Sequence, residues 1–225
     1  MIRAFGNLTG VSHEHVGATG FSLATLELDV GGQPLAFTAR GYQAEWLLAL
    51  LDGAPEGTPL EVFATASYSV SPAGKRVFVN LEVADLQFKM HDVNAEAKFS
   101  VQGFVAGVRE IPKRAGGSFA VGRLRQVAYG RHGPIEQAEL EVALHEDHVP
   151  NWHDSAGQLA TVRGTVYGFR SQTGRVWPRF SAAAIEASPP PSWLAAEEKA
   201  IGGAGEDVTA AAEETPSQPD PGFTF

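Results

Sequence analysis

The protein has 225 residues, of which 44% are hydrophobic, and a formal net charge of −9. It contains no cysteine, which excludes disulfides and thiolate metal sites. No signal peptide is recognisable, and no window approaches the ~20 apolar residues of a membrane helix, so we expect a cytoplasmic protein with no membrane partner. The acidic balance of the whole chain argues against nucleic acid as a partner.

The charge is divided unevenly along the chain. Residues 1–93 carry a net charge of −5, residues 94–187 carry +2, and residues 188–225 carry −6. The middle part, taken alone, therefore does not exclude a polyanionic partner.

The first part of the chain predicts three strands followed by a helix. A short strand around 6–11 carries two glycines, as strands do where they bend or closely approach another backbone. Alternating apolar residues predict a second strand over 21–30 and a third over 35–39. Strong helix formers over 43–51 predict the helix, and we expect Trp46 to pack it onto the strands.

A hairpin over 60–86 follows, and the same pattern recurs 99 positions later. Residues 60–68 are matched by residues 159–167. The matched pairs continue with Arg76, Phe78 and Leu86 against Arg175, Trp177 and Ile185. A constant offset through two apolar runs and the turn between them indicates an internal repeat.

The second repeat keeps the same order of elements. A strand with two glycines opens it at 103–108, and two further strands are predicted over 119–129 and 138–145. The helix position, 148–154, contains Pro150, which limits it to about one turn. Residues 188–225 are rich in Ala, Glu, Gly and Pro, which predicts a disordered acidic tail.

Five short strands with a helix between the third and fourth match the OB-fold, a small Greek-key barrel that binds oligonucleotides. The predicted fold is all-β, with one short helix per unit: two tandem OB-fold five-stranded barrels and a disordered acidic C-terminal tail. The predicted domains are 1–92, 93–187 and 188–225.

The run 35–68 resembles the corresponding run of bacterial single-stranded DNA-binding proteins, in which a third strand enters a helix, a Gly-containing turn follows, and a strand begins a long hairpin. Two such units before an acidic tail that ends in Phe resemble the tandem OB-fold type of the Deinococcus–Thermus group. The resemblance implies a nucleoid-associated homodimer that binds single-stranded DNA without sequence specificity in replication, recombination or repair.

The same resemblance implies that the tail recruits genome-maintenance proteins, with Phe223 and Phe225 as the partner-binding residues. The family tip has several consecutive acids before a Pro-Phe end. Here Asp220 is the only acid in the last ten residues, and Thr224 precedes Phe225. Weak or altered partner binding, or a tail that only solvates the protein, is equally consistent with this tip.

Single-stranded nucleic acid is held by a basic groove and by aromatic rings on which bases stack. In the second repeat, arginines and aromatic residues alternate with apolar residues, so they share strand faces. The predicted DNA contacts are Arg123, Arg125, Tyr129, Arg131, Arg163, Tyr167, Phe169, Arg170, Arg175, Trp177 and Arg179, with Tyr68, Arg76 and Phe78 from the first repeat. The alternative is that the aromatic residues are barrel core and the arginines ordinary surface.

The first repeat lacks most of this pattern, because Ala64 and Asn80 stand where the second repeat has Arg163 and Arg179. Glu27 aligns with Arg125. We therefore expect the first barrel to bind DNA weakly, or to serve mainly as a dimer or partner surface.

No other motif predicts chemistry. The histidines, such as those of His13-Glu-His15, match no zinc spacing, and no catalytic arrangement stands out, so we predict no metal, no cofactor and no enzymatic activity. The alternative function is an OB-fold module for protein–protein interaction or assembly without DNA binding. The net acidity and the acidic first repeat favour it.

Overall fold

A computed structural model describes residues 1–16, 20–70, 77–89, 94–112, 118–126, 128–130, 133–135 and 138–188. Residues 1–188 form a single compact unit. The predicted tail, with Phe223 and Phe225, and the candidate contacts Arg76 and Arg131 lie outside the described residues. Among described residues, no helix is long and apolar enough to cross a membrane.

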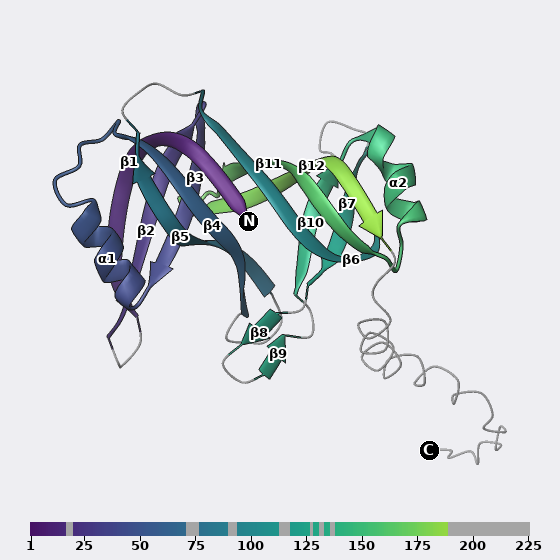
Figure 1. Cartoon of the computed structure of the whole chain (residues 1–225), viewed down its shortest axis with the longest axis horizontal. Coiled ribbons are helices and arrows are strands. Elements are labelled where there is room, and N and C mark those ends of the chain that lie inside the picture. The colour runs from purple at the N-terminus through teal and green to yellow at the C-terminus, as the bar shows by residue number, and fades with distance from the viewer. Residues whose placement is uncertain are drawn as a thin grey trace, which may run out of the picture. The chain divides into compact units, whose positions relative to one another are not determined.

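The first half of the chain forms a five-stranded barrel with one helix (Figure 1). Its elements are β1 (Ile2–Val16), β2 (Phe21–Val30), β3 (Gln33–Arg40), α1 (Tyr42–Leu50), β4 (Pro59–Val70) and β5 (Val77–Phe88). The hydrogen-bonded order is β1-β2-β3-β5-β4, and β1 also pairs with β4, which closes the barrel. The order of elements is the predicted one, although β1 is longer than the short strand expected.

The second half repeats this barrel, with an additional small hairpin. Its elements are β6 (Glu96–Pro112), β7 (Ser118–Arg125), β8 (Ala128–Gly130), β9 (Gly133–Ile135), β10 (Glu139–Leu144), a 3-10 turn (Glu146–His148), α2 (Val149–Asp154), β11 (Leu159–Arg170) and β12 (Val176–Ser188). The order is β11-β12-β10-β7-β6, with β11 also paired to β6. The prediction of two tandem OB-fold barrels is confirmed. The boundary between residues 92 and 93 stays a prediction.

The two barrels repeat even their irregularities. Thr9 is skipped in the pairing of β1 with β2, and Ala106 is skipped in the pairing of β6 with β7. Ala84 of β5 and Ala183 of β12 are skipped in the pairing of the two long hairpins. Each bulge bends its strand and increases the local twist, which helps a short sheet to close on itself. The bulges therefore mark the same corners in both barrels.

Glycines allow the first strand of each barrel to cross a neighbouring backbone closely. A Cβ on Gly6 would lie 2.4 Å from the carbonyl oxygen of Asp29, and a Cβ on Gly103 would lie 2.6 Å from that of Arg125. Real Cβ atoms do not approach so closely, so both positions require glycine. The sequence-based expectation of close backbone approach is confirmed at these two positions.

The helices pack on their barrels in different ways. In α1, Ala44 and Leu47 are fully buried and anchor the helix, whereas Trp46 is 37% exposed, so the deepest packing of α1 comes from Ala44 and Leu47 and not from Trp46. In α2, Trp152 is fully buried, and its Nε1–H donates to the carbonyl oxygen of Gly107 at 3.1 Å. A Cβ on Gly122 would lie 2.5 Å from the Trp152 ring, so glycine leaves the space that the indole fills.

The two barrels share one ten-stranded sheet, because β1 and β6 pair in antiparallel fashion. Residues 2–5 pair with residues 99–96, from Ile2 opposite Phe99 to Phe5 opposite Glu96. Both strands also remain members of their own barrels (Figure 1). The pairing joins segments that are about 90 residues apart, and no local pattern predicts it.

Candidate nucleic-acid interface

The outer side of β11 carries alternating aromatic and basic side chains. Val162, Gly164 and Val166 point inward and are buried, as the period-two pattern predicts. Arg163, Tyr167 and Phe169 lie on the opposite side, where Tyr167 is 40% exposed and Phe169 is 54% exposed. Two large rings are therefore available to solvent on one strand.

The neighbouring strand β12 places further cations and a ring beside them. Tyr167 lies opposite Arg179, and Phe169 lies opposite Trp177. The Arg175 guanidinium carbon lies 4.1 Å from the centroid of the Trp177 ring, which is a cation–π contact, and that of Arg179 lies 6.0 Å from the Phe169 centroid. We define the hairpin face as Arg163, Tyr167, Phe169, Arg175, Trp177 and Arg179.

The hairpin face keeps most of its positive charge uncompensated. Arg163 forms an ion pair with Glu186, but both side chains are more than half exposed, so the pair contributes little. Within the described part of the chain, Arg175 and Arg179 form no ion pair. Exposed cations interleaved with exposed rings can hold phosphates and stacked bases together.

The arginines of β7 lie in a different electrostatic setting. Arg123 forms an ion pair with Glu139 of β10 at 3.4 Å, and the adjacent Arg109 pairs with Glu141. Arg125 is exposed and has no ion pair with any residue that the structure describes. The β10 glutamates therefore offset much of the positive charge on the outer β7–β10 face, the face with which OB-folds bind oligonucleotides.

The interpretation of Tyr129 as a member of the same strand as Arg123 and Arg125 is wrong. β7 ends at Arg125, and Tyr129 belongs to the separate strand β8, which pairs with β9. Its side chain lies outside the described part of the structure.

The first-barrel candidates Tyr68 and Phe78 lie where the two barrels meet. The Phe78 ring stacks on the Trp177 ring, with centroids 5.2 Å apart and an interplanar angle of 24°. The Tyr68 hydroxyl donates to the side-chain carbonyl oxygen of Gln126, and burial raises the pKa of Tyr68 above its usual value. Both aromatic residues therefore contact the second barrel.

Arg170 also contacts the other barrel. Its Nη2 atom lies 2.7 Å from Oε2 of Glu27, and its Nη1 donates to the carbonyl oxygen of Gly174 at 2.9 Å. The first contact joins β11 to β2, and the second closes the turn at the tip of the hairpin. These contacts set Arg170 apart from Arg175 and Arg179.

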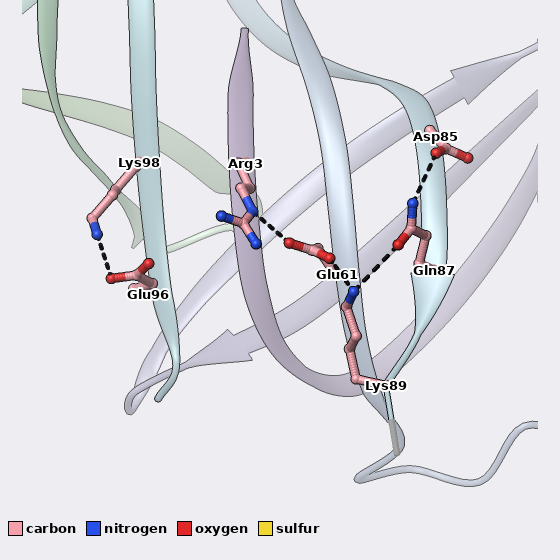
Figure 2. A network of polar contacts seen from close by, with 7 residues as sticks. All are labelled: Arg3, Glu61, Asp85, Gln87, Lys89, Glu96 and Lys98. Atoms are coloured by element: carbon pink, nitrogen blue, oxygen red, sulfur yellow. Dashed lines mark hydrogen bonds and ion pairs between the residues drawn. The ribbon is translucent and has the colours of Figure 1, made fainter. Parts of the chain in front are cut away.

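A second polar cluster, which sequence reasoning missed, lies beside the β1–β6 pairing (Figure 2). The Glu61 carboxylate is almost fully buried and accepts hydrogen bonds from Arg3 and Lys89. Lys89 also contacts Gln87 at 3.2 Å, and Lys98 pairs with Glu96 at 2.7 Å. The available signal was a single acid inside the apolar run 60–64.

This cluster surrounds a small cavity of about 160 Å³. Its lining contains three cations and two carboxylates: Arg3, Lys89, Lys98, Glu61 and Glu96, together with Phe5. The buried Glu61 carboxylate is shared by two of the cations, whose hydrogen bonds, first that of Lys89, hold its pKa below the usual value. We therefore interpret the Arg3–Glu61–Lys89 group as a structural ion network of the first barrel, beside the β1–β6 pairing.

Replacing Glu61 with glutamine is expected to lower the free energy of unfolding by about 1–3 kcal/mol at pH 7, because two charge-assisted hydrogen bonds lose their anionic acceptor. The lowered pKa means that wild-type Glu61 stabilises the fold above its ordinary value of 4.5, and that this stabilisation is lost as the pH falls below it. Denaturant unfolding at pH 7 and pH 3.5 measures both effects, and the difference between variant and wild type should shrink at the lower pH.

The matched control is Glu96→Gln, because Glu96 pairs with Lys98 in an exposed position. A change of about 0.5 kcal/mol or less is expected there. Equal losses in the two variants would contradict a special role for the buried carboxylate.

Among the described residues, no group of three or more His, Asp or Glu side chains is placed to hold a metal ion.

Comparison with known proteins places this geometry in a known fold. No protein-family model matches the chain, and no curated protein matches its sequence. The structure of the wild-type single-stranded DNA-binding protein from Thermus aquaticus matches with a TM-score of 0.58 and 19% identity, over 84% of this chain and 93% of that chain. The chain shares the fold of the Thermus aquaticus protein. A deletion variant of the same protein matches equally well, over 94% of its length.

Proposed function

We propose that the protein binds single-stranded DNA without sequence specificity, and that the hairpin face holds the strand. The observation that carries this proposal is the interleaving of the exposed rings of Tyr167 and Phe169 with Arg163 and Arg179. The shared fold with a protein named for single-stranded DNA binding supports the same ligand.

The chemistry of the hairpin face explains why binding tolerates different sequences. Guanidinium groups neutralise phosphates, which are identical at every nucleotide, and every base has a flat face that can stack on a ring. Binding of this kind requires no helix that reads a DNA groove and no catalytic step. A duplex hides its base faces inside the helix, so single strands are the preferred ligand.

The first barrel has a different role in this proposal. Tyr68 and Phe78 contact the second barrel, which supports weak or no DNA binding by the first barrel alone. In this proposal the second barrel is therefore the main DNA-binding unit, and the first barrel contributes little direct contact to DNA.

The proposal also covers the cellular role of the protein. Coating of single strands in replication, recombination or repair, a homodimer, and recruitment of partners through the tail all follow from the family resemblance of the sequence. Residues 188–225, the tail, have a net charge of −6. In this proposal the tail competes with DNA for the arginines of the second barrel.

Titration with oligo(dT), followed by tryptophan fluorescence, tests the proposal. Log K should fall linearly with log salt, and duplex DNA should bind more weakly. In the double variant Arg163→Ala with Arg179→Ala, affinity should fall, and the salt slope should become shallower by about 1.4, because each lost phosphate contact on a single strand removes about 0.7.

The control is Lys98→Ala with Arg109→Ala, which removes two exposed cations of β6 outside the hairpin face. Its salt slope should match that of the wild type. Equal affinity for duplex and single strands, or equal slopes in the two double variants, would count against the proposal.

A specific observation favours a second function, an interaction module without DNA binding. Phe78, Trp177 and Arg170 all make contacts between the barrels, so part of the aromatic and basic pattern already has a structural use. A folded wild-type protein that fails to bind oligo(dT) at low salt would exclude the DNA-binding proposal and favour this alternative.

A further inference from the structure

The tip of the β11–β12 hairpin extends beyond its own barrel. The pairing of β11 with β6 ends at Thr165, and the pairing of β12 with β10 is confined to Phe180 and Ser181. In the described ladders, the remaining residues of β11 and β12 toward the turn pair only with each other. A two-stranded ribbon is marginally stable by itself, so this tip needs support from elsewhere.

The first barrel contacts the ribbon at the side opposite Tyr167 and Phe169, and its Phe78 also stacks on Trp177 of the hairpin face. Gly168 lies against β3 so closely that a Cβ there would be 1.6 Å from the carbonyl oxygen of Pro34. Val176, opposite Arg170 in the ribbon, is only 7% exposed. Gly168 and Arg170 share one side of β11, whereas Tyr167 and Phe169 share the other. Packing on the first barrel therefore leaves Tyr167, Phe169 and Arg179 of the hairpin face open, whereas Trp177 of the same face stacks on Phe78.

Charge complementarity accompanies this packing. Glu27 and Asp29 lie on the outer side of β2, in the region that corresponds to the oligonucleotide-binding face of an OB-fold. Carboxylates there repel phosphates and attract the arginine-rich ribbon, and Arg170 forms its ion pair with Glu27 at 2.7 Å. The first barrel thus presents an acidic surface to a basic segment of the second.

We propose that the first barrel holds the β11–β12 ribbon in its DNA-binding orientation, and that Glu27 is the positioning residue. This inference rests on the proposed function. A ribbon fixed before binding loses less conformational freedom when DNA binds, which raises affinity without any new contact to the ligand. The first barrel contributes to binding through Glu27 although its own acidic face is unsuited to DNA.

The variant Glu27→Ala tests the proposal, because simple electrostatics and positioning of the ribbon predict opposite changes in affinity for oligo(dT). It removes a negative charge near the hairpin face, so simple electrostatics predicts tighter binding of a polyanion. Positioning predicts weaker binding to oligo(dT), by about 2- to 5-fold, the range expected for a solvent-accessible ion pair. The salt slope should stay the same, because no phosphate contact is lost.

The matched control is Glu45→Ala, which removes the same charge from an exposed position on α1. Glu45 has no ion pair among the described residues, and affinity should be unchanged or slightly higher. Glu27→Ala binding as tightly as wild type, or more tightly, would overturn the proposal.

Hydrogen exchange measured without DNA tests the support of the ribbon independently of the proposed function. Backbone amides of residues 166–179 should exchange faster in Glu27→Ala and in Arg170→Glu, and the double variant Glu27→Arg with Arg170→Glu should restore slow exchange. Unchanged exchange in the single variants would overturn the inference. If the wild type fails to bind oligo(dT) while these exchange effects appear, the proposed function is wrong and the support of the ribbon stands.

Discussion

Replacing Tyr167 and Phe169 together with alanine is expected to weaken oligo(dT) binding by at least about 30-fold, because stacking contributes roughly 1–3 kcal/mol per base. Both rings are exposed on the open side of β11, so their removal leaves the barrel core unchanged. Fluorescence or anisotropy titration at a single salt concentration measures the loss. The salt slope should stay near the wild-type value, because the arginines remain.

The control for this experiment uses exposed aromatic residues of the first barrel. Tyr42 is 83% exposed on α1 and Phe88 is 47% exposed at the end of β5. The double variant Tyr42→Ala with Phe88→Ala should bind oligo(dT) as the wild type does. Equal losses of affinity in the two double variants would show that the effect does not depend on where the exposed rings lie. The hairpin face would then have no special role in DNA binding.

The largest expected effect on stability belongs to Trp152. Its replacement with alanine should lower the free energy of unfolding by about 3–5 kcal/mol, because a fully buried indole leaves a large cavity. The space above Gly122 would be empty, and the carbonyl oxygen of Gly107 would lose its donor. Denaturant or thermal unfolding measures this loss.

Trp46 is the natural comparison, because it occupies the helix of the other barrel and is 37% exposed. Trp46→Ala should cost much less than Trp152→Ala. A similar loss in both variants would mean that the buried indole is not the main support of its barrel.

The repeat made the architecture predictable from the sequence. Patterns a few residues long revealed the repeat, with its offset of 99 positions, and the order of elements in each unit. The alternation of apolar residues also predicted the strand over 21–30. The period-two alternation of β11 likewise predicted which side of the strand Arg163, Tyr167 and Phe169 would occupy. These features are local because a strand sends alternate side chains to opposite faces wherever it lies.

The sequence pattern could not separate residues that face solvent from residues that join the barrels. Phe78, Trp177 and Arg170 were all predicted as DNA contacts, and all three make contacts from one barrel to the other. The depth at which Trp46 and Trp152 lie is likewise a tertiary property, since a single tryptophan in a short helix does not indicate how deeply the helix packs. Burial in such cases depends on what the rest of the chain places nearby.

By itself, then, the sequence determined two repeated barrels, the order of their elements along the chain and the alternation of the β11 face. Only the tertiary structure decided that β1 pairs with β6, that Glu61 is buried between Arg3 and Lys89, and that Glu27 meets Arg170. The first set follows from short-range backbone geometry and the hydrophobic period. The second set joins residues far apart in the chain. The β1–β6 pairing and the Glu27–Arg170 pair join the two barrels, and Glu61 meets Arg3 and Lys89 where strands of the first barrel come together.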